Sequence, residues 1–102
     1  MNPEGNGQGG PFEVSIPAIV IASIKKWHAE AVLAGAGEQF LTALRQIIHR
    51  LHRDPFNFGE ALYNLPALKL HVRQAIVLPV LVNYSVHVER PIVFVRGFRG
   101  LW

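Results

Sequence analysis

Residues 38–53, with the sequence EQFLTALRQIIHRLHR, decide the fold of this chain. Apolar residues recur every three or four positions, and the basic and imidazole side chains lie mostly off that stripe, which is typical of an amphipathic helix. The helix ends before Asp54-Pro55, because proline disfavours helical geometry at the residue before it. Such a helix must bury its stripe against another element. The stripe consists of Phe40, Leu41, Leu44, Ile47, Ile48 and Leu51.

A second helix is predicted over residues 17–33. Pro17 suits the first turn of a helix, where its missing N–H costs nothing. The glycines of residues 34–37 break the helix and favour a tight reversal. Because only about four residues join the two helices, we expect them to pack antiparallel as a hairpin. The apolar face of this helix is formed by Val20, Ile24, Trp27 and Ala31.

The remaining segments alternate with a period of two, which predicts strands over residues 12–16, 68–73, 77–88 and 92–98. Residues 57–66 are predicted to be a connecting loop, and turns are expected at Gln74-Ala75 and at residues 89–91. The predicted fold is α+β, in the order β-α-α-β-β-β, with a helix hairpin on one face of a mostly antiparallel sheet.

The length and composition indicate one domain. The chain has 102 residues, half of them hydrophobic, which is enough for one core but not two. Residues 1–10 are rich in glycine and are predicted to be a flexible tail, so the domain spans residues 11–102. The longest apolar stretch, residues 16–24, is too short to cross a bilayer, and no secretory signal is recognisable. We therefore expect a cytoplasmic protein with no membrane partner.

Cofactor chemistry has little support in the sequence. No cysteine is present, which excludes disulfides, thiolate metal sites and a cysteine nucleophile. His49 and His52 are three residues apart on a helix, but Arg45 and Arg53 surround them and no carboxylate completes a site. We expect no metal and no cofactor.

The distribution of charge predicts an anionic partner. Residues 1–65 carry five bases and six acids, whereas residues 66–102 carry five bases and one acid. The basic excess therefore lies in the last third of the chain and suits either a nucleic acid or an acidic protein.

The candidate site lies on the predicted strand over residues 68–73. Lys69, His71 and Arg73 alternate with leucine and valine, so we expect them to share the sheet face opposite the helices. They form either a phosphate-binding and acid–base surface or the ordinary solvated side of a half-buried sheet. Further candidates on the neighbouring strands are Asn83, Ser85, His87, Arg96 and Arg99, with Tyr84 or Phe98 for stacking on unpaired RNA bases.

The order of these motifs resembles the RelE/ParE superfamily of bacterial toxin–antitoxin toxins. The likeness covers about residues 11–101. It rests on Phe40-x3-Leu44-x2-Ile47-x3-Leu51 with Asp54-Pro55, then Gly59-x2-Leu62, Leu65, Lys69-Leu70-x2-Arg73, Val82-x-Tyr84-x-Val86 and Ile92-Val93-Phe94-Val95.

The resemblance implies a toxin neutralised by a cognate antitoxin whose peptide wraps it. RelE-like members cut mRNA on the ribosome without a metal, using basic residues of the sheet, whereas ParE-like members poison DNA gyrase. The resemblance makes Lys69, His71, Arg73 and Arg96 the expected catalytic residues. Asn83, His87 and Arg99 are the expected nucleic-acid or partner contacts.

One departure from the family pattern leaves a second hypothesis open. Pro79 stands where the family usually has an arginine early in the next strand. Loss of a cation that stabilises developing charge lowers a rate by about 10² or more. The first hypothesis is therefore a plasmid-stabilisation type toxin that inhibits growth and is a metal-independent endoribonuclease or a gyrase inhibitor. The alternative is a catalytically inactive RelE/ParE-fold interaction domain that forms homodimers.

Overall fold

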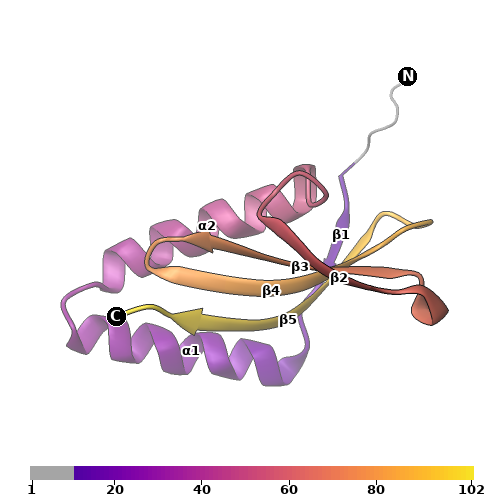
Figure 1. The fold of residues 1–102 in the computed structure, drawn as a ribbon. Helices are drawn as coiled ribbons and strands as arrows, with labels where there is room; N and C mark the ends of the chain where they lie inside the picture. Colours follow the sequence, from indigo (N-terminus) through magenta and orange to yellow (C-terminus); the bar gives the residue numbers. More distant parts are fainter. Residues whose placement is uncertain (1–10) are drawn as a thin grey trace.

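The computed structural model describes residues 11–102, in which two helices pack on a five-stranded mixed sheet (Figure 1). This confirms the predicted α+β class. The tail predicted for residues 1–10 lies outside the described residues. No helix between residues 11 and 102 combines the length and apolarity needed to span a membrane. The elements are β1 (Glu13–Ser15), α1 (Ala18–Leu33), α2 (Gly37–Arg53), β2 (Glu60–Leu65), the 3-10 helix η1 (Pro66–Leu68), β3 (Leu70–Val77), β4 (Val80–His87) and β5 (Ile92–Gly100).

The helix hairpin forms where the sequence predicts it. Gly35 adopts a φ of 77° between the helices, a left-handed conformation that glycine reaches without a steric penalty. Arg50 Nε donates to Asp54 Oδ1 at 2.7 Å across the last turn of α2, and the helix ends at the expected Asp54-Pro55. The residues that α2 buries are Phe40, Ala43, Ile47 and Leu51.

The strands have the order β1-β5-β4-β3-β2, and β1 pairs parallel with β5 while all other pairs are antiparallel. The face of the sheet that the helices cover carries the core. In β4 and β5, the buried residues that pack with the helices are Val80, Val82, Tyr84, Val86, Val93, Val95 and Phe98. We call the other side of the sheet the open face, because neither helix lies on it.

The sequence prediction misses one strand. Residues 57–66 are predicted to be a loop, but β2 pairs antiparallel with β3 and forms the edge of the sheet. All residues of β2 except Leu65 are exposed, so burial imposes no apolar alternation on the segment. The observed order is therefore β-α-α-β-β-β-β.

The position of the next turn is also corrected. Gln74 and Ala75 are not a turn, because they pair with Asn83 and Val82 in the ladder between β3 and β4. The reversal instead occurs at Leu78-Pro79, which is a cis peptide bond. Proline suits this position because it has no N–H to donate to a strand ladder.

Candidate nucleic-acid interface

The register of β3 contradicts the expectation that Lys69, His71 and Arg73 share the sheet face opposite the helices. His71 lies opposite Val86, and Arg73 lies opposite Tyr84, in the ladder between β3 and β4. Side chains of residues that lie opposite each other point to the same side of a sheet. Val86 and Tyr84 are buried on the helix side. His71 and Arg73 therefore point to the helix side, and the prediction that they lie on the opposite face is wrong.

A short loop, rather than a helix, covers the sheet above these two residues. Arg73 Nε donates to the Phe58 carbonyl oxygen at 3.2 Å, and its Nη2 donates to the Gly59 oxygen at 3.3 Å. The His71 ring stands edge-on to Phe56, with centroids 5.8 Å apart. The loop that follows α2 thus offers carbonyl groups to the Arg73 guanidinium and an aromatic ring to the His71 imidazole. An apolar helix surface would leave these polar groups without partners.

Lys69 lies outside the strand altogether. Lys69 ends η1 and has a φ of 56°, in the left-handed region. This conformation turns the chain into β3. Its Nζ forms an exposed ion pair with Glu89, at 3.0 and 3.1 Å from the two carboxylate oxygens. Lys69 is therefore engaged beyond the end of β3 and is not part of a common surface with His71 and Arg73.

The open face instead gathers other predicted residues. Arg99 lies opposite Leu81, and Asn83 lies opposite Gly97, all on the side away from the helices. Arg96 follows the same side, because its Nη1 donates to the buried Ser85 Oγ at 3.3 Å. Two exposed guanidinium groups and an amide thus stand on the central strands β4 and β5.

Two aromatic residues that the sequence reasoning missed flank this cluster. A single row across the open face runs from Tyr63 through Val72 and Ser85 to Phe94. Tyr63 is 52% exposed and Phe94 is 37% exposed, so both rings are accessible. Tyr63 was missed because β2 was not predicted. The signal that would identify Phe94 is its alternation with the buried Val93 and Val95.

The two aromatic residues named from the sequence are part of the core. Tyr84 is fully buried and Phe98 is 5% exposed. Burial raises the pKa of Tyr84 above its usual value of 10.0, while the neighbouring Arg73 lowers the pKa and offsets part of this effect. Neither ring is available for base stacking.

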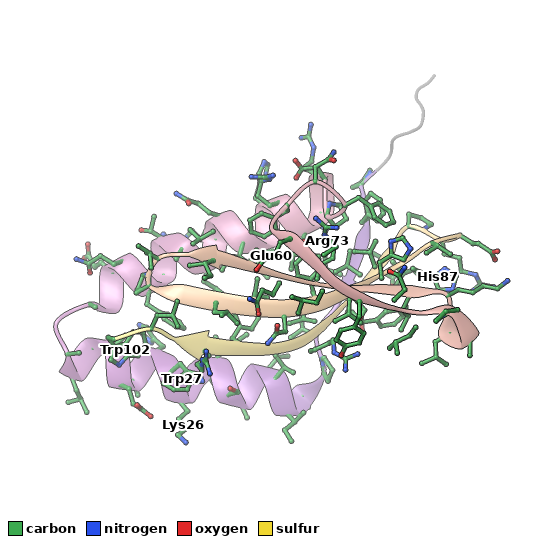
Figure 2. The ribbon with its side chains drawn as sticks, viewed as in Figure 1. Lys26, Trp27, Glu60, Arg73, His87 and Trp102 are labelled. Carbon is green, nitrogen blue, oxygen red and sulfur yellow. The ribbon has the colours of Figure 1, made fainter. Side chains whose placement is uncertain are left out.

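His87 lies on the same open side but at one tip of the sheet, at the opposite end from Trp102 (Figure 2). Its Nδ1 accepts hydrogen bonds from the backbone N–H groups of Glu89 at 3.0 Å and Arg90 at 3.1 Å. The neutral ring therefore carries its proton on Nε2. This imidazole fixes the turn between β4 and β5 and leaves Nε2 as a donor.

The acidic residues of the open face lie at its margins. Glu13 is in the edge strand β1, and Glu60 is in the edge strand β2, where its carboxylate accepts from Gln74 Nε2 at 3.4 Å. Arg96 and Arg99 lie between these edges on β5. The β5 side of the open face thus carries two cations, which suits an anionic ligand.

Residues 11–102 contain no group of three metal-ligating side chains. His52 is engaged through Nδ1, which lies 2.8 Å from the Phe12 carbonyl oxygen, and His49 is exposed on α2. Comparison of the chain with models of protein families, with curated proteins and with solved structures finds no match.

Proposed function

We propose that this chain is a RelE/ParE-like toxin that binds ribosome-associated mRNA across the open face of its sheet and is neutralised by a cognate antitoxin in the cytoplasm. The observation that carries the proposal is the placing of Arg96 and Arg99 on an uncovered sheet face that also exposes Tyr63 and Phe94. Arginines beside exposed aromatic rings bind unpaired RNA, because the cations neutralise phosphates while the rings stack on bases.

The dimensions of the open face fit a single strand. Tyr63 and Phe94 are three strand positions apart in one row, which corresponds to about 14 Å at the usual spacing of strands. The two rings can therefore stack on different bases of one extended chain. Arg96 lies two residues from Phe94 on β5, and Arg99 lies three residues further along the same strand, so a bound RNA strand would bring phosphates to both cations.

Binding has more support than cleavage. Metal-independent cleavage of RNA needs a proton acceptor and cations that stabilise developing charge. Of the four expected catalytic residues, only Arg96 lies on the open face, because Lys69, His71 and Arg73 are engaged elsewhere. His87 lies on that side, but its Nδ1 already accepts hydrogen bonds from two backbone N–H groups.

The binding test uses a fluorescent single-stranded RNA of 12 nucleotides in fluorescence anisotropy. We expect Arg96→Ala, Arg99→Ala and Tyr63→Ala each to weaken binding by about fivefold or more. Each arginine variant should also reduce the dependence of affinity on salt concentration. Arg45→Ala, which changes an exposed arginine of α2 away from the open face, is the matched control and should bind as the wild type does. Equal losses in all four variants, or no saturable binding, would contradict an interface on the open face.

The toxin assignment has its own test. Induced expression should slow growth, and ribosomes programmed with mRNA should show either cleavage or stalled translation that Arg99→Ala relieves. Inhibition of gyrase supercoiling with no effect on translation would transfer the assignment to a ParE-like activity. Wild-type protein that neither slows growth nor acts on either target would exclude the toxin function.

A second candidate function is an inactive RelE/ParE-fold interaction or dimerisation domain. The observation in its favour is the outer side of α1, where Ile19 is 80% exposed and Leu33 is 88% exposed. Ile21 and Val32 are exposed beside them, and grouped apolar side chains of this kind mark a surface that a partner can cover. Light scattering separates the candidates, because a stable dimer that Ile19→Lys dissociates, without RNA binding, would favour this one.

A further inference from the structure

One end of β3 has an unpaired outer edge. β3 extends to Val77, but its pairing with β2 stops where Glu60 lies opposite Gln74. Within residues 11–102, no strand pairs with the outer edge of residues 75–77. Gly59 explains why the chain turns away from β3 before residue 60. Its φ of 66° turns the backbone away, and it lies so close to β3 that a Cβ would overlap the Gln74 carbonyl oxygen.

In the part of the chain that the structure describes, the free edge carries none of the usual protection against strand pairing. Proteins commonly protect such edges with charged residues, proline within the strand or a covering loop. Residues 75–78 are Ala-Ile-Val-Leu, with Ile76 53% exposed and Leu78 75% exposed. An unprotected apolar edge is the feature to which extended peptides add as a further strand.

A groove between α2 and β3 runs beside this edge. It has a volume of about 380 Å³, and its apolar floor is formed by Val77 and the buried Phe58. The α2 side of the groove supplies cations and a histidine, and the guanidinium of Arg50 lies 4.7 Å from the centre of the Phe58 ring. The remaining residues that line the groove are Arg45, Gln46 and His49.

We propose that an extended acidic peptide of a partner protein adds a strand to β3 at residues 75–77. Its backbone pairs with the free edge, and an apolar side chain enters the groove over Val77 and Phe58. Its carboxylates face Arg45 and His49, because no acidic side chain from residues 11–102 lines this groove. The proposal does not depend on the proposed RNA binding, whose cations, Arg96 and Arg99, are on β5.

Two other occupants fit the edge less well. A second copy would pair residues 75–77 with the same segment of its partner, and this segment, Ala-Ile-Val, supplies no carboxylate to Arg45 and His49. Residues 1–10, MNPEGNGQGG, contain no alternating apolar residues to fill the groove.

The first step of the test is to select binders of the full chain from a random library of ten-residue peptides displayed on phage. We expect the selected sequences to alternate apolar residues with aspartate or glutamate. Hydrogen exchange should then show slower exchange of backbone amides in residues 75–77 when a selected synthetic peptide is bound. Protection confined to the open face or to α1 would refute the proposal.

A charge exchange supplies the second step. The double variant Arg45→Glu with His49→Glu changes only exposed residues of α2 and should bind the selected peptide about tenfold more weakly. A synthetic version of the peptide with lysine in place of its acidic residues should regain affinity for that variant. Arg99→Glu on the open face is the matched control and should leave peptide binding unchanged.

Three results would overturn the proposal. The selected peptides could be basic or lack acidic residues, or the charge exchange could leave affinity unchanged. A concentration-dependent dimer that protects residues 75–77 without any peptide would identify a second copy as the occupant instead. RNA affinity of the double variant is measured in parallel, so that failure of this proposal and failure of the RNA-binding proposal are distinguishable.

Discussion

Arg73 and Tyr84 lie opposite each other on neighbouring strands and both reach the carbonyl oxygen of Phe58. The Tyr84 hydroxyl also lies 2.8 Å from the Pro55 carbonyl oxygen. These two side chains tie the loop after α2 to the sheet. This explains why a charged residue occupies the covered face of β3, since its guanidinium satisfies carbonyl groups that would otherwise be poorly paired.

The first prediction concerns this tether. Arg73→Ala removes hydrogen bonds to the Phe58 and Gly59 carbonyl oxygens, so we expect the free energy of unfolding to fall by about 1 to 2 kcal/mol. Urea denaturation measures the change. Arg99→Ala is the control, because Arg99 is exposed and should alter stability by less than about 0.5 kcal/mol. Similar stability of the two variants would show that the tether contributes nothing.

The second prediction concerns alkaline pH. Burial raises the pKa of Tyr84 above 10.0, so the folded protein keeps this proton at a pH where the unfolded chain loses it. Stability should therefore decline as pH rises above about 10, because the folded state then binds more protons than the unfolded state. Tyr84→Phe should lower stability by about 1 to 3 kcal/mol near neutral pH and flatten this alkaline decline.

Tyr63→Phe is the control for the alkaline measurement, since Tyr63 is exposed on β2. Thermal unfolding followed from pH 8 to pH 11 should show the same decline for Tyr63→Phe as for the wild type. An unchanged decline in Tyr84→Phe would assign the alkaline effect to another group.

The third prediction compares two glycines with similar backbone angles. Gly59 and Gly35 both have positive φ values, 66° and 77°, but only Gly59 is close to other atoms. A Cβ on Gly59 would lie 2.7 Å from the Ala75 Cβ, whereas a Cβ on Gly35 would meet nothing within 4 Å. We expect Gly35→Ala to cost about 1 kcal/mol through backbone strain alone, and Gly59→Ala to cost more. Equal losses in urea denaturation would mean that the loop moves away without penalty.

The fourth prediction concerns Lys69. Its ion pair with Glu89 is exposed, so we expect Lys69→Ala to change the free energy of unfolding by less than about 1 kcal/mol. Because Lys69 lies outside the strands and is paired with Glu89, RNA affinity should also stay within about twofold of wild type at 0.15 M salt. A large loss of RNA affinity in this variant, with normal stability, would show that Lys69 is part of the RNA-binding site.

The helices are predictable from sequence because burial imposes their periodicity directly. Ile47 is fully buried in the middle of α2, and Ala43, Leu44 and Leu51, which lie three or four residues from it, are apolar for the same reason. The same logic works for β4, where the helices cover every second residue. It fails for β2, whose exposed positions carry no burial signal.

The face of β3 was misassigned because alternation does not say which side the helices cover. Val72 is 2% exposed, although it lies on the open face, because its neighbours on that face bury it. Arg73 is on the covered side, where the loop rather than a helix lies above it. Such a position is decided by the contacts of residues distant in sequence, and a pattern within one strand cannot contain that information.

The parallel pairing of β1 with β5 joins the first described strand to the last one. Val14 lies opposite Val93, and α1 packs against both β5 and α2. During translation, the helix hairpin therefore emerges long before the strand on which it rests. A truncated product ending before Ile92 would present the bare apolar sides of both helices, so we expect chaperones and proteases to recognise incomplete chains as unfolded.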